Sequence, residues 1–279
     1  MLASSCSKED KLSSRDAERK TVFHAVIEPG TKVYSDEKLK VRWNEGDKIT
    51  IFNKRTLNDQ YAFLGEDGDT GGDFELIPYS GFSTGNDIDY IVAVYPYAKG
   101  SGNKINNAGN KVTASVAASQ NFKEGSVGVG ANLMVAMIDP ANGDDQFLSF
   151  KNVCGFIRLR LYGDNASVSS VSLTGNNEEK IAGKAAIVPS VDKDPTITMD
   201  ATATTTVNLV CETAVTLGTS ATDYTEFVVA IPPVTFTGGF TIVVTNPDGK
   251  TFTKSTTKSL TVSRNKMESM GAIKVSFAD

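Results

Sequence analysis

Hydrophobic and polar residues alternate in short runs along most of the chain. The first run, residues 21–28 (TVFHAVIE), places Val22, His24 and Val26 opposite three apolar neighbours and stops at Pro29-Gly30. Alternation with a period of two is typical of β-strands. Because both sets of positions are mostly apolar, we expect this strand to lie near the centre of a sheet with both faces covered.

Similar runs recur to the end of the chain, separated by turn-forming residues. They read YAFLG, FELIP, YIVAVYPY and NLMVAMI in the first half, and FLSFKNVCGFIRLRLYG, SVSSVSLTG, TITMDATATTTVNLV, EFVVAIPPV, TIVVTNPDGKTFTK and GAIKVSF in the second. No helical pattern of 10 to 15 residues separates them. This order predicts an all-β protein built of β-sandwiches, not a parallel α/β sheet.

One hairpin is predicted at LKVRWNEGDKITIF, residues 39–52, with the turn at NEGD. Trp43 alternates there with Leu39 and Val41 on one strand face, which favours a place in the core. The alternative is an exposed indole that stacks against a sugar ring.

Turn formers and charges divide the chain. Residues 7–20 are charged and serine-rich, which predicts a flexible tether. The turn cluster DPANGDD at 139–145 precedes a fresh series of strands. We therefore expect a start and tether at 1–20, an N-terminal β-sandwich at 21–145 and a C-terminal β-sandwich at 146–279.

Composition excludes several classes of partner and chemistry. The formal net charge is -5 over 279 residues, which argues against nucleic acid as a partner, and no stretch is apolar for the roughly 20 residues that a membrane-spanning helix needs. Cys154 and Cys211 lie in apolar runs, so buried free thiols are expected, with a disulfide between them as the alternative. The cysteine spacing matches no zinc or redox motif, and no cofactor is predicted.

Candidate catalytic groups are sparse. His24 is the only histidine, no common catalytic motif surrounds it, and a structural role is expected, so we predict that the protein is not an enzyme. A hydrolase based on two carboxylates is the weakest alternative. The acidic loop at 65–75 (GEDGDTGGDFE) is interpreted as a solvated hairpin turn and not as a cation site, because its spacing departs from the twelve-residue calcium loop.

Three stretches together resemble the fimbrillin-like family, which comprises surface lipoprotein pilus subunits and pilus-associated proteins of gut and oral Gram-negative anaerobes. They are the W-x-x-G-D core of the 39–52 hairpin, the IVAVYPY strand and the LASSC start. The resemblance implies two transthyretin-like β-sandwich domains in tandem and subunits that assemble into fimbriae by β-strand exchange, with residues 21–28 as the removable strand. It also implies other fimbrial subunits as partners.

The resemblance assigns a role to the start of the chain. Leu2 to Ser5 are similar to a lipobox, Cys6 is similar to the cysteine that receives palmitate, and SKED is similar to an export signal for the outer face of the outer membrane. The family's processing protease cuts after arginine downstream of the first strand. The candidate positions here are Arg15 and Arg19 before that strand, Lys32 in the loop after it, and Arg42, which falls in a predicted strand.

Two functions from different classes follow. The favoured one is a fimbrial structural or adhesive subunit anchored at the cell surface. The alternative is a glycan-binding surface lipoprotein whose partners are host or bacterial glycans and whose binding platforms are Trp43, Tyr95 and Tyr97.

Overall fold

The structure is a computed structural model that describes residues 20–29, 41–78, 85–100, 102–143 and 145–277. These residues form strands β1 to β22 and one short 3-10 helix, η1 (Pro140–Asn142). The all-β prediction is therefore confirmed. No helix in these ranges has the length and hydropathy that crossing a bilayer requires.

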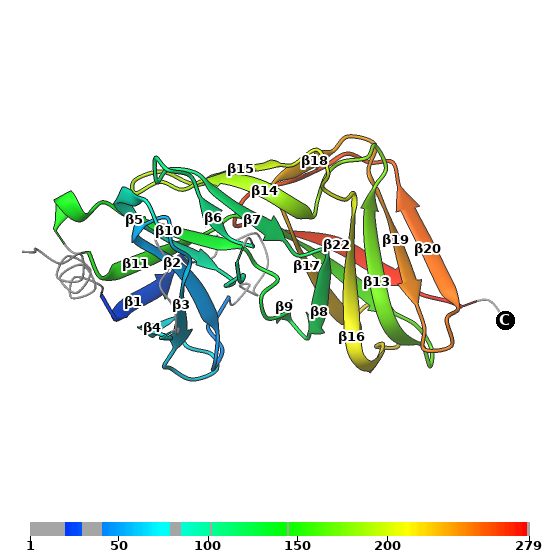
Figure 1. The fold of residues 1–279 in the computed structure, drawn as a ribbon. Coiled ribbons are helices and arrows are strands. Elements are labelled where there is room, and N and C mark those ends of the chain that lie inside the picture. Colours follow the sequence, from blue (N-terminus) through cyan, green and yellow to red (C-terminus); the bar gives the residue numbers. More distant parts are fainter. Residues whose placement is uncertain (1–19, 30–40, 79–84, 101, 144, 278–279) are drawn as a thin grey trace, which may run out of the picture.

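Seven strands of the N-terminal half form a closed barrel, seen on the left of Figure 1. Around the barrel, the strands are β1 (Val22–Ile27), β11 (Phe147–Asn152), β10 (Met134–Ile138), β5 (Asp87–Tyr95), β2 (Lys48–Arg55), β3 (Asp59–Phe63) and β4 (Gly71–Leu76). Alternate residues of these strands point inward around Trp43 and form an aromatic core with Phe23, Tyr61, Phe74 and Phe150.

Strand β1 closes this barrel. It pairs antiparallel with β4 and parallel with β11, so the predicted position inside a sheet is confirmed. The prediction that both faces are covered is wrong. Phe23 and Ala25 are buried on the inner face, whereas on the outer face His24 is exposed and Val22 and Val26 are half-buried.

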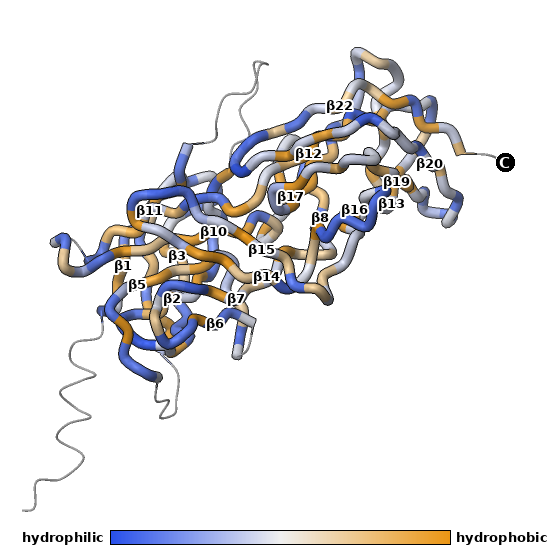
Figure 2. The backbone as a smooth tube through the Cα atoms, turned by 90° about the horizontal axis from the view of Figure 1, so that it is seen from above, coloured by the Kyte–Doolittle hydropathy of each residue, from blue (hydrophilic) through white to orange (hydrophobic). Residues whose placement is uncertain are grey.

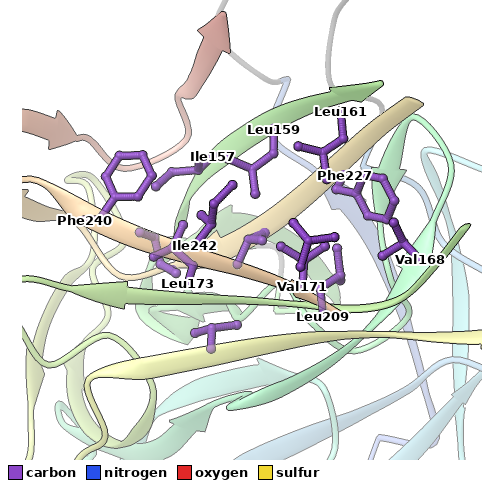
Figure 3. Packing of buried hydrophobic residues seen from close by; sticks show 14 of the residues in the cluster. Ile157, Leu159, Leu161, Val168, Val171, Leu173, Leu209, Phe227, Phe240 and Ile242 are labelled. Atoms are coloured by element: carbon purple, nitrogen blue, oxygen red, sulfur yellow. The ribbon is translucent and has the colours of Figure 1, made fainter. Parts of the chain in front are cut away.

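The C-terminal half, on the right of Figure 1, is a two-layer sandwich. One layer contains β17 (Thr225–Ile231), β12 (Gly155–Tyr162) and β22 (Met267–Lys274). The other contains β20 (Thr251–Thr256), β19 (Phe240–Thr245), β13 (Ser167–Gly175), β16 (Thr206–Thr216), β8 (Ser119–Lys123) and β9 (Ser126–Val127). Figure 3 shows Ile157, Leu159 and Phe227 of the first layer packed against side chains of the second.

Each half of the chain contributes strands to the sheets of the other half. β14 (Gly183–Val188) and β15 (Thr196–Met199) come from the C-terminal half of the sequence but join β7 (Val112–Val116) and β6 (Lys104–Ile105) in one sheet beside the barrel, in the order β15-β14-β7-β6 with β14 paired to β7. In the other direction, β8 pairs with β16 of the sandwich, and the Gln120 side chain bonds both backbone groups of Ala230. A short pair of β18 (Val234–Phe236) and β21 (Leu260–Val262) completes the fold.

A third cluster of buried residues joins the halves. The outer face of β5 contributes Val92 and Val94, and the back of the sandwich contributes Phe156 and Val228. Figure 2 shows hydrophobic segments concentrated inside both halves and hydrophilic segments in the outer loops. The barrel sheet also continues past residue 145 through β11, so the first sheet ends later than the turn cluster at 139–145.

The predicted hairpin at 39–52 is wrong. Residues 41–44 form no strand, and residues 39 and 40 lie outside the described residues. The backbone of Trp43 bonds Asp69 and Gly68 of the acidic loop instead of the β2 strand. The Trp43 indole lies in the barrel interior, so residues 41–44 pass across the end of the barrel. The pattern also fails to predict β7, β8 and β14, whereas the hairpin of β19 and β20 around Asn246–Gly249 is confirmed.

Candidate functional site: the closing strand of the barrel

Strand β1 is the first described strand of the chain, so only its C-terminal end leads on to another described strand of the barrel. Its neighbours β4 and β11 are remote in sequence, so no hairpin turn joins β1 to either of them. Its inward residues, Phe23 and Ala25, are fully buried, and the Phe23 ring meets the Tyr61 ring edge-on at 5.5 Å between centroids. The strand therefore occupies a slot made by the rest of the barrel.

Side chains and backbone hold the beginning of β1. The ammonium group of Lys20 pairs with the carboxylate of Asp145, and the Tyr61 hydroxyl donates to the Lys20 carbonyl at 2.8 Å. The backbone N–H of Leu76 donates to the Thr21 carbonyl at 2.8 Å. The hydrogen bond from Lys20 lowers the pKa of the Asp145 carboxyl, so this contact is an ion pair at neutral pH.

A second set of contacts, which we call the latch, holds the end of β1. The latch consists of Glu28, Pro29, Asn152, Arg264 and Asn265. One carboxylate oxygen of Glu28 accepts hydrogen bonds from the Arg264 guanidinium and from the Asn152 backbone N–H. Asn265 donates from its amide to the Pro29 carbonyl at 3.2 Å and accepts from the Asn152 amide at 2.7 Å.

The latch connects β1 to the C-terminal half. Arg264 and Asn265 follow β21 in the sandwich, and Arg264 is separated from Glu28 by 236 residues. The other terminal nitrogen of Arg264 pairs with Asp194 at 2.7 Å. The Glu28 and Arg264 side chains are 18% and 17% exposed, so their charges are mostly shielded from water. No sequence pattern points to these contacts, because their members share neither a motif nor a strand.

The outer face of β1 carries a weaker contact. His24 Nδ1 lies 2.8 Å from an oxygen of Asp73 on β4, and the His24 ring stacks on Phe147 of β11 at 5.5 Å. Both partners of the polar contact are about half exposed. His24 thus bridges the two strands that flank β1, which agrees with a structural role.

The aromatic candidates for a glycan platform have different positions. Trp43 and Tyr95 are buried in the barrel core, so the core interpretation of Trp43 is confirmed and both residues are excluded as exposed platforms. Tyr97 is half-buried and lines a surface cavity. Cys154 and Cys211 are free, buried thiols, as predicted, and burial raises their pKa to about 12 and about 11.

The acidic loop joins β3 to β4 as a hairpin, as predicted. Its carboxylates bond backbone groups nearby. Asp67 accepts from the Glu45 N–H at 2.8 Å, and Asp69 accepts from the Glu66 N–H at 2.9 Å. Across the residues that the structure describes, no group of three or more His, Cys, Asp or Glu side chains is arranged to hold a metal ion.

The processing and lipidation candidates lie mostly outside the described residues. Cys6, Arg15, Arg19 and Lys32 all fall in the ranges 1–19 and 30–40, and their roles stay predictions. Arg42 is described, and its expected place in a strand is wrong, because residues 41–44 form no strand and the side chain is exposed.

No protein-family model and no curated protein sequence matches the chain. Among solved structures, a proposed cell adhesion protein from Bacteroides ovatus superposes with a TM-score of 0.52 at 12% identity, covering 92% of this chain and 93% of that one. The chain shares that protein's fold. A proposed cell adhesion protein from Bacteroides uniformis (TM-score 0.46, 18% identity, 91% and 93% covered) and a fimbrial protein from Bacteroides ovatus (TM-score 0.40, 13% identity, 92% and 50% covered) are more distant.

Proposed function

We propose that the chain is a fimbrial or adhesive subunit at the cell surface and that subunits assemble by exchange of β1. The observation that carries the proposal is the position of β1, which fills a slot between two strands and has no turn to either. The shared fold with a proposed cell adhesion protein agrees with this role. Other subunits of the same fibre are the partners.

Once β1 has left, the free energy of the empty slot favours binding of another strand. Removal of β1 would expose apolar surface around the Phe23 and Ala25 positions, at a cost of roughly 1.5–3 kcal/mol for a large buried side chain such as Phe23. It would also leave β4 and β11 with unpaired backbone groups. An added strand satisfies such edges through main-chain hydrogen bonds, and its alternate side chains fill the pockets. A strand from another subunit is therefore a suitable replacement.

Proteolysis supplies a route to release. A cut at Lys32 or Arg42 would sever the connection between β1 and the rest of the barrel, so that only non-covalent contacts would hold the strand. A cut at Arg15 or Arg19 would leave β1 connected. The Arg42 side chain is exposed, but the bond after it joins Trp43, which is buried and whose N–H donates to the Asp69 carbonyl, so cleavage there requires this contact to open.

A lipid on Cys6 would anchor the subunit in the outer membrane through the 7–20 tether. Metabolic labelling with palmitate in a Gram-negative anaerobe tests this anchor. We expect label in the unaltered protein and in Cys211→Ala, which lacks a buried thiol, and none in Cys6→Ala. Label retained in Cys6→Ala would contradict the anchor.

Exchange itself is tested by cross-linking two different copies. His24 and Asp73 are cross-strand neighbours with side chains in contact, so cysteines introduced at both positions would face one another. One full-length variant carries His24→Cys and the other Asp73→Cys, both in a Cys6→Ser background. The Asp73→Cys variant is digested briefly with trypsin, the protease is inhibited, and the undigested His24→Cys variant is added before mild oxidation, so that the incoming β1 stays joined to its own copy.

Exchange predicts a disulfide between the cysteine introduced in β1 of the undigested copy and the cysteine introduced in β4 of the digested copy, which links the two chains covalently. The matched control replaces Asp73→Cys with Lys258→Cys, an exposed position in the sandwich. Cross-linking no greater than in the control would contradict strand exchange, because random collisions would then explain it.

A further inference from the structure

A surface cavity at one end of the barrel has the chemistry of a binding site. Its volume is about 790 Å³, within the roughly 300–1,000 Å³ typical of small-molecule sites. It lies between the β2–β3 connection, the end of β4 and the segment that follows β5. Its polar lining combines amides, one phenol ring and ammonium groups, from Asn58, Gln60, Tyr97, Lys99, Lys104 and Asn107.

The wall of the cavity is fixed by hydrogen bonds. Asn103 is only 2% exposed, and its amide nitrogen donates to the Thr50 hydroxyl at 3.0 Å and to the Pro96 carbonyl at 2.9 Å. The Asn58 amide nitrogen donates to the Ala98 carbonyl at 2.8 Å and to the Asn103 carbonyl at 3.0 Å. These contacts hold the segment after β5 against the β2–β3 connection, so the cavity is preformed.

One acceptor in this wall is unsatisfied. The side-chain oxygen of Asn58 is buried and has no hydrogen-bond partner among the described residues. A buried polar atom without a partner costs about 1–3 kcal/mol, so a small rearrangement of the wall that lets this oxygen meet a ligand hydroxyl would be favourable.

The charge of the cavity is positive in a protein that is negative overall. Lys99 and Lys104 are exposed at its rim, and neither forms an ion pair within the described part of the chain. None of the described lining residues is Asp or Glu, although the chain carries a net charge of -5. The cavity therefore favours an anionic ligand.

We propose that this cavity binds an acidic carbohydrate, a sugar that carries a carboxylate such as a uronic acid. The side-chain amides of Gln60 and Asn107 offer donors and acceptors, which matches the hydroxyl groups of a sugar. The ring of Tyr97 offers an apolar surface to the C–H groups, and the two lysines pair with the carboxylate. This binding does not depend on strand exchange.

The test is a calorimetric titration of the full chain with a trisaccharide that ends in glucuronic acid and with the matched trisaccharide that ends in glucose. We expect the acidic sugar to bind at least ten-fold more tightly. The double substitution Lys99→Gln and Lys104→Gln should remove that preference. The double substitution Lys254→Gln and Lys258→Gln on the sandwich, with the same change in net charge, should leave it intact.

Three results would overturn the proposal. They are no binding of the acidic sugar, equal affinity for the two sugars, and an equal loss of affinity in both double variants, which would indicate non-specific attraction. An aspartate-rich peptide serves as a further carboxylate probe. Tighter binding of that peptide than of the acidic sugar would also count against a carbohydrate site.

Discussion

The barrel is a closed sheet, whereas the sandwich is built of open sheets with edge strands. In the sandwich, β19 and β20 are joined by the short turn at Asn246–Gly249 and pair over their full lengths. In the barrel, closure depends on β1, which has no turn to either neighbour and is held at its ends by Lys20 and by the latch. Under the proposed exchange, a strand held this way can leave its sheet, whereas a strand of a hairpin stays joined to its neighbour by the turn.

The single tryptophan makes this difference measurable. Trp43 is the only one in the chain, and it lies fully buried in the barrel core with four aromatic rings within 6.0 Å between centroids. Its fluorescence reports on the barrel, whereas circular dichroism reports on strands of both halves. The two signals distinguish local opening of the barrel from unfolding of the whole chain.

The largest effect is expected from Phe23→Ala in β1. Removing a fully buried phenylalanine costs about 3–5 kcal/mol, so urea should unfold the barrel, seen by Trp43 fluorescence, well before the sandwich. The matched variant Phe227→Ala in the sandwich should shift the circular dichroism transition instead. Coincident transitions of both signals in both variants would show that the halves unfold as one unit and would break the comparison.

A smaller effect is expected from Arg264→Gln in the latch. The substitution leaves the Glu28 carboxylate partly buried without its cation, at a cost of about 1–3 kcal/mol. Hydrogen exchange of the β1 amides should accelerate more than that of β19. Lys274→Gln removes a largely exposed ion pair and should change stability by less than about 1 kcal/mol. Equal acceleration in β1 and β19 would contradict a local role for the latch.

A pH-dependent effect is expected at Asp47, which is 6% exposed at the barrel end. Burial raises the pKa of its carboxyl above 3.8, although hydrogen bonds from Asn44 and Tyr95 oppose the shift. The folded state therefore holds the proton more tightly than the unfolded state. The stability gained from the protonated form is full below pH 3.8 and is lost as pH rises through the raised pKa.

The test compares unfolding free energies between about pH 3.5 and 6.5, a range that brackets the ordinary carboxyl pKa values. Over that range the stability of Asp47→Asn should rise relative to the unaltered protein. Asp145→Asn should fall relative to it, because the Lys20 contact lowers the pKa of Asp145 and its stabilisation is lost in acid. The same sign of change in both variants would contradict the assigned causes.

The smallest effect is expected from His24→Gln. The contact with Asp73 is about half exposed on both sides, so its loss should change the unfolding free energy by no more than about 1 kcal/mol. A much larger loss, measured by urea denaturation, would show that the outer face of β1 contributes more to the slot than its inner face.

The hydrophobic pattern predicts a strand when the alternation of its own residues shows which face is buried. Strand β19 alternates clearly because one face is buried, whereas residues 21–28 are apolar at positions on both faces, which leads to the wrong expectation that both faces are covered. The hydrophobic pattern wrongly predicts a hairpin at 39–52, since Trp43 alternates like a strand residue but enters the barrel from its end. β14 has short apolar runs between polar turns, and only its pairing with β7 and β15 stabilises it as a strand.

The candidate site was predictable only in part. The closing strand has a sequence signature, because an apolar run begins the described fold and stops at Pro29. The latch has none, since Glu28 and Arg264 meet only after the sandwich folds against the barrel. Contacts between isolated polar residues that are far apart in sequence produce no periodic pattern of hydrophobic and polar positions.

The most direct test of the closing-strand account adds β1 back as a separate molecule. A chain that begins at residue 29 is titrated with the synthetic peptide TVFHAVIE, and Trp43 fluorescence and thermal stability are followed. The account predicts that this peptide restores both signals, and that a scrambled peptide of the same composition or one with Phe23→Ala does not. Failure of the native peptide to restore either signal, with the chain aggregating instead, would contradict the claim that β1 is a replaceable strand.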